Sequence, residues 1–182
     1  MADLDSMYTV AQTINYECYL DNQKFLGTAS IDLPEITYQT QDISGAGLGG
    51  TVNYPSLWLT DSLTTTLHWR SMTPHTSDLA EQKKLDIQMY SAVNRYKNSD
   101  GTLEPLAIAI NIRGLAKKTG VGKFQPNELM DSETEIEIIR LEIKINNVEK
   151  YLIDKVGYQF KINGVDYLAD VKNILDNGYL TT

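Results

Sequence analysis

The chain has 182 residues, a length typical of one domain, and its 24 acidic and 16 basic residues give a net charge of −8. This balance argues against a protein that coats nucleic acid by neutralising phosphates. Cys18 is the only cysteine, so an internal disulfide and a thiolate-rich metal site are both excluded, and its phase with neighbouring apolar residues predicts a core position.

The first part of the chain is predicted to form short β-strands after a loose start. Residues 1–12 are polar and mixed, which predicts a loosely held N-terminal arm. Alternating side chains predict a strand over 13–20 and a returning strand over 24–33, with Asp21-Asn22 as the turn between them. A further extended segment is expected over 35–43.

A run of glycines then gives the chain its most unusual composition. Ordering so many glycines costs conformational entropy, so such a loop is either flexible alone or ordered by a neighbouring molecule. We predict a glycine-rich loop over 42–60, and its most distinctive residues are Ser44, Gly45, Gly47, Leu48, Gly49, Gly50 and Tyr54.

The middle of the chain predicts a strand, a brief helix and a hairpin. Residues 63–71 alternate, with Leu63, Thr65, Leu67 and Trp69 on one face. Asp78 and Glu81 have capping-box spacing, which predicts a short helix within 74–84.

The hairpin follows directly. Two alternating segments, 85–96 and 102–113, are separated by turn residues at 98–101 and therefore predict paired antiparallel strands.

A lysine-containing connection is expected over 114–131, followed by the longest strand over 132–146. The apolar phase of that strand slips by one residue, which predicts a β-bulge between Ile138 and Ile139. Its polar face begins with an acidic stripe, which is either solvated or faces a lumen, and this stripe consists of Glu133, Glu135 and Glu137.

The chain ends with a strand, a tight turn and a helix. Alternation from Lys155 predicts a strand, and Asn163-Gly164 supplies the positive-φ residues of a hairpin turn. A helix is predicted over 166–176, with Asp166 as its cap and Asn177-Gly178 as its stop. Its apolar face should dock on an apolar surface, and it consists of Leu168, Val171, Ile174 and Leu175.

Together these elements predict one mainly β domain over residues 1–182. We expect an antiparallel β-sandwich or rolled barrel with one or two short α-helices. Nothing in the pattern closes the sheet within one chain. Long open strand edges that Lys, Pro or a bulge does not protect are expected to pair with another copy.

Several functional classes find little support in the sequence. Gly45, Gly47 and Gly50 match a dinucleotide fingerprint by letters only, because Tyr54-Pro55 follows where a helix is required. No nucleophile, base and orienting group are grouped, so we expect no enzyme, cofactor or metal. No membrane segment or signal region is evident, and we expect a protein made in the cytoplasm.

The residues around Asn163-Gly164-Val165-Asp166, over 157–171, resemble the ending of the major tail tube proteins of contractile-tailed phages and phage-tail-like bacteriocins. Segments 19–22, 25–27 and 31–34 and the glycine-rich stretch are also similar to that family, so the resemblance covers most of the chain. The lysine-rich connection over 114–123 departs from it.

The resemblance implies a structural role. Subunits would form hexameric rings, which stack into a hollow tube with a continuous inner β-barrel. The glycine-rich loop would act as a stacking loop, ordered by the next ring. Tail sheath, baseplate and tail terminator proteins would be partners, and the tube would belong to a virion tail assembled in the bacterial cytoplasm. DNA would pass through without specific binding, repelled by acidic residues.

Two alternatives remain at this stage. One is the inner tube of a bacterial injection or secretion machine, which shares the architecture. The other is a monomeric β-sandwich that binds carbohydrate through Trp58, Trp69 and the tyrosines. The second predicts a stable monomer with one aromatic-lined groove, and it leaves the glycine-rich loop and the final helix without a role.

Overall fold

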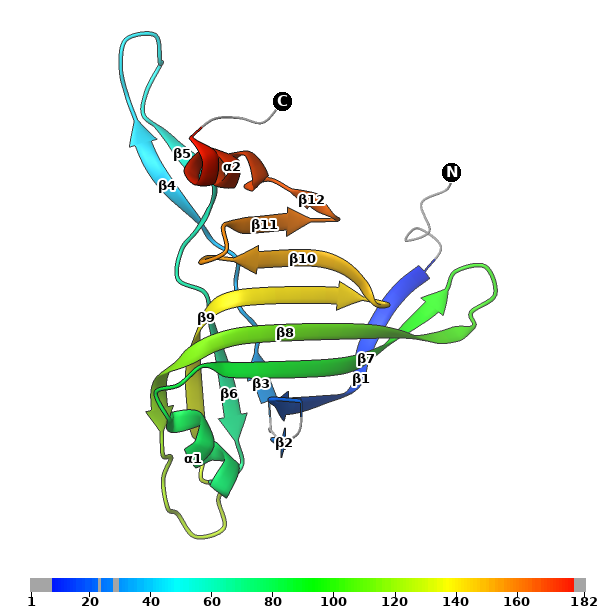
Figure 1. The fold of residues 1–182 in the computed structure, drawn as a ribbon. Coiled ribbons are helices and arrows are strands. Elements are labelled where there is room, and N and C mark those ends of the chain that lie inside the picture. The colour runs from blue at the N-terminus through cyan, green and yellow to red at the C-terminus, as the bar shows by residue number, and fades with distance from the viewer. Residues whose placement is uncertain (1–7, 23, 28–29, 179–182) are drawn as a thin grey trace.

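The structure is a computed structural model that describes residues 8–22, 24–27 and 30–178 (Figure 1). The chain is mainly β, with a curled antiparallel sheet and two short helices. The elements are β1 (Tyr8–Leu20), β2 (Lys24–Phe25), β3 (Ser30–Asp32), β4 (Tyr38–Ile43), β5 (Val52–Thr60), β6 (Thr64–Trp69), α1 (Pro74–Ala80), β7 (Leu85–Lys97), β8 (Leu103–Gly120), β9 (Ser132–Ile145), β10 (Val148–Asp154), β11 (Gln159–Ile162), β12 (Val165–Asp166) and α2 (Ala169–Asn177).

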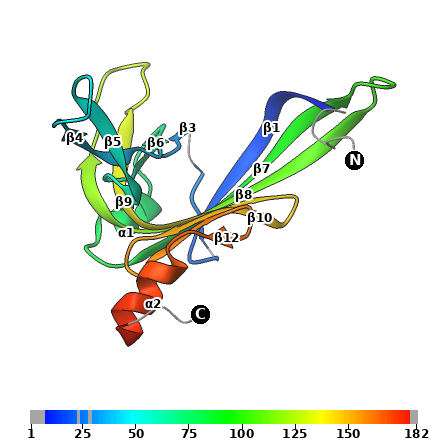
Figure 2. The same cartoon turned by 90° about the horizontal axis from the view of Figure 1, so that it is seen from above.

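One large sheet organises the molecule. Its strands follow the order β12-β11-β10-β9-β8-β7-β1-β2, and β6 pairs with β9 and with β3 off this path. Figure 2 shows β1, β7 and β8 running together away from the curled half of the sheet. Strands β4 and β5 form a separate hairpin. The expected antiparallel, rolled architecture is confirmed.

A β-bulge in β9 explains how the sheet curls. Arg113 lies opposite Arg140, but the next residue, Gly114, lies opposite Ile138, so Ile139 is the extra residue. Before the bulge β9 pairs with β6, and after it β9 pairs with β10. The predicted bulge is confirmed, and it lets one strand serve two parts of the sheet, since bulges bend and twist a strand.

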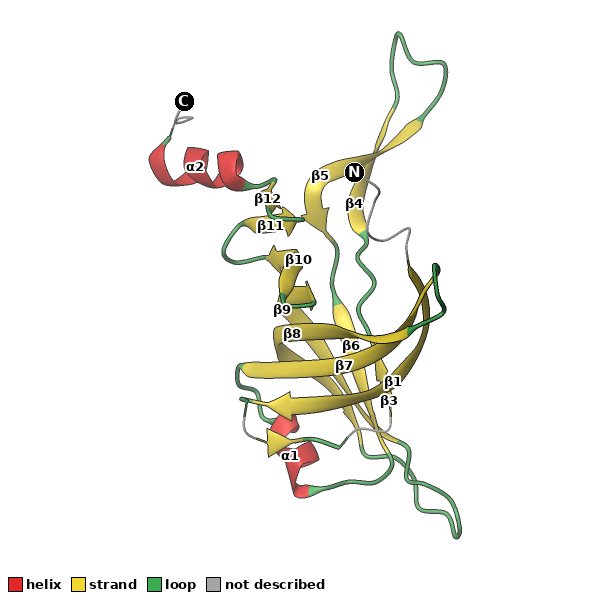
Figure 3. Cartoon of the chain, turned by 90° about the vertical axis from the view of Figure 1, so that its right-hand side faces the viewer, coloured by secondary structure: helices red, strands yellow, loops and turns green. Residues whose placement is uncertain are grey.

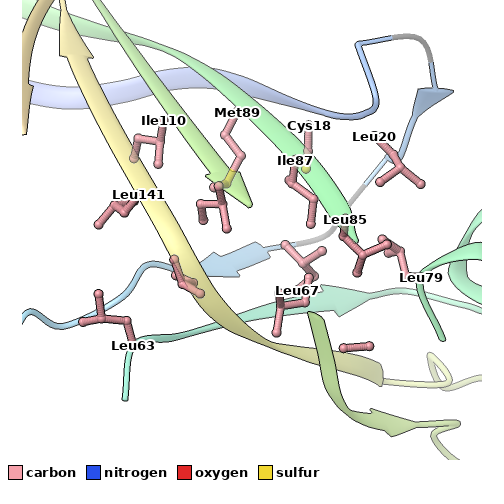
Figure 4. Close-up of a cluster of buried hydrophobic side chains, with 14 of the residues drawn as sticks. Cys18, Leu20, Leu63, Leu67, Leu79, Leu85, Ile87, Met89, Ile110 and Leu141 are labelled. Atoms are coloured by element: carbon pink, nitrogen blue, oxygen red, sulfur yellow. The ribbon is translucent and has the colours of Figure 1, made fainter. Parts of the chain in front are cut away.

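The core lies where the curled sheet closes over itself (Figure 4). The predicted face of β6 is buried, including Leu67 and Trp69, and one face of the alternating strand β7 is buried too, including Ile87. The indole nitrogen of Trp69 donates a hydrogen bond to Thr134 Oγ1 at 3.1 Å, so its buried polar atom is satisfied. Cys18 is buried as predicted, and burial raises the pKa of its thiol to about 12.

The N-terminal predictions need two corrections. Strand β1 begins at Tyr8, so residues 8–12 of the expected arm belong to a strand, and residues 8–10 pair with β7, while residues 1–7 lie outside the described residues. The expected strand over 24–33 is divided, because β2 pairs with β1 and β3 pairs with β6. Gly27 has φ of 63°, a left-handed conformation that ends β2.

The caps of the helices also differ from the prediction. Thr73 caps α1, its backbone N–H donates to Thr76 Oγ1, and Pro74 opens the helix, where its missing N–H carries no penalty. Asp78 therefore lies inside α1. Asp166 is not the cap of α2, because Leu168 holds that position. The Oδ1 of Asp166 accepts the N–H groups of Leu168 and Phe160 at 3.1 and 3.3 Å.

At the end of the chain the predicted turn and stop hold, but two element bounds differ. The strand predicted from Lys155 begins only at Gln159, after a turn over 155–158, and the helix predicted over 166–176 is Ala169–Asn177. Asn163 and Gly164 have φ of 51° and 85°, as the predicted hairpin turn requires. Gly178 adopts a left-handed conformation after α2, and its N–H donates to the carbonyl of Ile174. The predicted stop is confirmed, since this is a common helix ending.

Strand β8 is longer than predicted. It has 18 residues against 14 in β9, so β8 and not β9 is the longest strand. The expected connection over 114–131 is wrong in its first part, because residues up to Gly120 pair with β9. Pairing partners that are distant in the sequence override the polar, loop-like composition of this segment.

Candidate assembly surfaces

The β4–β5 hairpin projects beyond the large sheet (Figures 1 and 3). Only its tip, residues 44–51, is a loop, so much of the loop predicted over 42–60 is in fact strand. The tip holds the predicted glycines, Ser44 and Leu48, while Tyr54 lies on β5. Its apolar side chains are exposed, and Leu57 on β5 reaches 77% exposure. The hairpin therefore presents apolar surface away from the core.

Trp58 anchors the base of this hairpin. Its φ of 61° is a rare conformation for a bulky residue, and it lies where the β4–β5 register shifts. Its ring stacks on Tyr167 with 4.0 Å between centroids and packs against Phe160 at 5.2 Å. Tyr38 also contacts Phe160, at 6.0 Å. These contacts tie the hairpin to β11 and to the segment before α2.

A pocket of about 170 Å³ opens beside Trp58. Its lining includes Ile153, Phe160 and Leu168, which belong to the core cluster, and Tyr158. No sequence pattern indicated this pocket, because its lining comes from segments that are far apart in the chain.

The apolar face of α2 is largely uncovered by the described residues. Leu168 is buried, but Val171, Ile174 and Leu175 are exposed, Leu175 at 60%. Figure 3 shows α2 extending away from the sheet. The predicted docking face is therefore available to another molecule.

The acidic stripe lies on β9, between β8 and β6. Each of its carboxylates has a lysine partner, and the pairs are Glu133 with Lys118 at 2.6 Å, Glu135 with Lys117 at 3.0 Å and Glu137 with Lys155 at 3.7 Å. The hydrogen bond from Lys118 holds the pKa of Glu133 below its usual value. The extension of β8 brings two of these lysines to the stripe, so its charge is compensated within the subunit.

A second polar surface covers the broad sheet opposite the core. Asp86, Arg113, Arg140 and Asp154 lie in one row across β7, β8, β9 and β10. Arg113 pairs with Asp86 at 2.8 Å, and Arg140 pairs with Asp154 at 3.4 Å. Burial opposes ionisation of Asp86, but Lys84 and Arg113 outweigh it and hold its pKa below the usual value. This row, which we call the charged row, is balanced in sign.

The large sheet also has open edges. β1 pairs with β7 along one side, and on its other side, within the described residues, only the short β2 pairs, at Tyr19 and Leu20. The opposite end of the strand order is the two-residue strand β12. Unpaired backbone groups on a long strand favour pairing with another chain.

None of the helices in the described part of the chain is long and apolar enough to span a membrane.

An incompletely closed sheet, a projecting apolar hairpin and an exposed amphipathic helix together define a structural subunit built to contact other molecules. Residues 11–175 match the model of the phage tail tube protein FII family. The chain therefore belongs to this family of tail tube proteins, and it is an inner tube subunit. The resemblance found in the sequence is confirmed.

Solved structures support the same fold. A chain of the PVC extracellular contractile injection system, from the sheath–tube complex in its extended state, is 18% identical, with a TM-score of 0.52 and coverage of 71% of this chain and 87% of that chain. A chain from the PVC sheath/tube terminator is 17% identical, with a TM-score of 0.51 and coverage of 72% and 94%. A chain of the anti-feeding prophage tube-terminating cap is 18% identical, with a TM-score of 0.51 and coverage of 79% and 99%. No curated protein sequence matches the chain.

Proposed function

We propose that this tube subunit forms closed six-membered rings, which stack into the hollow conduit of a contractile tail or tail-like particle. The single observation that carries the proposal is the open, curled sheet of a family member. Pairing β1 with the far edge of a neighbouring sheet would remove the open edges, because a closed barrel has none. The number six rests on the family resemblance.

Electron microscopy tests this proposal directly. Negatively stained protein is imaged across a concentration series, with and without purified baseplate as a template. Rings or hollow rods are the expected result. Monomers alone at every concentration, even with baseplate present, would contradict it.

The β4–β5 hairpin acts in stacking. Its tip projects from the sheet. Its leucines and Tyr54 stay exposed, because the other described residues do not cover them. Contact with the next ring would bury these side chains and order the glycines at the tip, a change that many assembly contacts show. Stacking through two different surfaces gives a filament, since such contacts do not close on themselves.

The charged row supplies the best surface for the bore. It lies on the broad sheet face opposite the core, and its ion pairs leave little net charge to attract a nucleic acid. DNA would therefore pass without specific binding. The acidic stripe is a second possibility for the bore or for contact with a sheath. Unchanged DNA ejection after Glu133, Glu135 and Glu137 are all replaced by Gln would count against a bore position for the stripe.

The partners follow from the same role. The neighbouring structures come from a sheath–tube complex, a baseplate and a terminating cap. We extend these contacts to this chain as tail sheath, baseplate and terminator proteins, with assembly in the bacterial cytoplasm before the particle is complete.

An injection-machine tube is the second candidate, and one observation favours it. Two of the solved structures that share the fold belong to an extracellular contractile injection system. Mass spectrometry and nucleic-acid staining of purified particles separate the two, because a phage tail is attached to a DNA-filled head. The carbohydrate-binding module is disfavoured, since Trp69 is buried and Trp58 stacks on Tyr167.

A further inference from the structure

The final helix is mounted with its polar side against its own chain. Within α2, Ala169, Lys172 and Asn173 share one side at helical spacing, and these three residues are partly buried. The opposite side, which we call the α2 face, is exposed and consists of Val171, Ile174 and Leu175. A surface helix normally turns its apolar side toward its own core. The reversed mounting therefore presents the apolar side to another molecule.

This helix stands beside one end of the large sheet. It follows directly after β12, the last strand of the sheet at that end. Figures 2 and 3 show α2 on one side of the sheet and the β4–β5 hairpin on the other. Strand β6, which covers the core, lies on the hairpin side in Figure 2. The helix therefore stands on the face that carries the charged row.

A hollow of about 470 Å³ lies on the same face near the other end of the sheet, between β1, β7 and β8. Ala109 lines it and is four residues from Arg113 of the charged row, so the two side chains point to one face of β8. The lining is mostly apolar and also includes Tyr90, Ala92 and Ala107, beside the polar residues Asn15 and Glu17. Small alanine side chains leave room for larger apolar ones, as interdigitated packing requires.

Ring closure as proposed above would bring these two ends together. Pairing β1 with the β12 end of a neighbouring sheet places α2 of one copy beside β1 of the next, on the face that holds the hollow. The pairing would use β1 before Tyr19, because β2 already pairs with Tyr19 and Leu20. Asn15 and Glu17 belong to that part of β1 and also line the hollow. The strand that receives the neighbour is therefore one wall of the hollow.

We propose that the α2 face of each copy packs into the hollow of the next copy in the same ring. This inference rests on the proposed closure of rings by β1 and the far edge of a neighbouring sheet. Every copy carries one α2 face and one hollow, so a closed ring satisfies all of them. The contact would take three apolar side chains out of water at each junction, which favours the closed ring over the separate subunits.

Site-directed crosslinking tests this contact. Assembled tubes of a Leu175→Cys and Ala92→Cys double variant are treated with a short bismaleimide, since both positions are exposed in the single chain. Cys18 does not interfere, because it is buried. We expect a ladder of covalent multimers that stops at the number of subunits in one ring, and no ladder from dilute monomer.

A matched control pairs Leu175→Cys with Leu33→Cys. Leu33 is 53% exposed, but it lines a pocket with the core residues Met89 and Ile110, on the face opposite the hollow. This pair should give no ladder.

A second variant weakens the contact without a crosslinker. Leu175→Ser should raise the critical concentration for tube growth at least about tenfold, equivalent to ~1.4 kcal/mol per contact. The urea unfolding midpoint should not change, because Leu175 is 60% exposed in the single chain. Leu175→Met keeps an apolar side chain and should assemble like the unaltered chain. Leu33→Ser is the control for loss of an exposed leucine elsewhere.

The outcomes separate the two proposals. Tubes that give no ladder, or a ladder that continues beyond one ring, would overturn the contact within the ring and leave the tube function standing. An unchanged critical concentration for Leu175→Ser would do the same, and α2 would then be free to meet another protein such as a sheath. Failure of the unaltered chain to form tubes, even with baseplate, would overturn both.

Discussion

Two loops at opposite ends of the molecule show two different uses of glycine. At the tip of the β4–β5 hairpin, a Cβ added to Gly45, Gly49 or Gly50 would meet no described atom within 4 Å. In the loop between β8 and β9, residues 121–131, which we call the β8–β9 loop, a Cβ on Gly122 would lie 2.1 Å from the carbonyl oxygen of Met130, and the φ of Gly122 is +78°. Glycine provides freedom at the first loop and is sterically required at the second.

The difference indicates two ways of building an assembly contact. A loop with open glycines can take its final shape from a partner, at an entropic cost paid on binding. A loop fixed by internal hydrogen bonds carries its shape into the contact.

Deleting residues 45–50 should have the largest effect on assembly. The tip lies outside the core cluster, so we expect a folded monomer with an unchanged circular dichroism spectrum. Tubes should not form, because the proposed stacking element is lost. Electron microscopy with baseplate present is the measurement. Tubes that grow at the normal rate would show that the hairpin tip is dispensable.

Gly122→Ala should have the largest effect on folding. The added Cβ clashes with the backbone of Met130 and is strained at positive φ, so we expect a loss of about 1–3 kcal/mol in the free energy of unfolding. Urea denaturation measures it. Gly49→Ala is the matched control and should stay within about 0.5 kcal/mol of the unaltered chain. Equal effects of the two variants would remove the contrast between the loops.

Trp58→Ala should have an intermediate effect on stability, and this effect should be confined to the β4–β5 hairpin. Loss of the stack on Tyr167 and of the contact with Phe160 should cost roughly 1–2 kcal/mol, partly offset by relief of strain at positive φ. Hydrogen exchange should then show faster exchange in β4 and β5 and no change in β8 and β9. Uniformly faster exchange would argue against Trp58 as a local anchor.

The smallest effect on stability is expected when the pH is lowered, through the ion pair of Lys118 and Glu133 at the stem of the β8–β9 loop. Lys118 lowers the pKa of Glu133 in the folded chain, so this pair stabilises the fold above the unfolded pKa. The contribution is lost as pH falls through the lowered value, below the usual range of a glutamate.

Urea midpoints at pH 7 and pH 3 measure this acid dependence. The unaltered chain should lose slightly more stability between the two pH values than a Glu133→Gln variant does. If the Glu133→Gln variant loses as much stability between pH 7 and pH 3 as the unaltered chain, the pair of Lys118 and Glu133 is not the source of the acid dependence.

The sequence predicted features that depend on local pattern. The alternation in β6 and β7 identified their buried faces, because each residue's phase fixes its side of the sheet. The phase slip at Ile139 located the bulge for the same reason. Asn163 and Gly164 identified their turn because few residues tolerate positive φ.

Features that depend on distant partners were missed. Residues 114–120 have a loop-like composition, but they form strand because β9 pairs with them and supplies Glu133 and Glu135 to their lysines. The strained backbone of Trp58 and the pocket beside it also arise from contacts between distant segments. Most of the predicted assembly residues lie at the surface, although Leu168 is buried, and their roles stay predictions.

The positions of the two tryptophans give the protein a built-in optical probe. Trp69 is sealed in the core and hydrogen-bonded to Thr134, so its fluorescence should not respond to other copies. Trp58 lies partly exposed on β5 of the proposed stacking hairpin, where contact with the next ring would displace water from the indole. Emission from a single tryptophan would therefore shift to shorter wavelength as rings join, and tube growth could be followed in real time without a label.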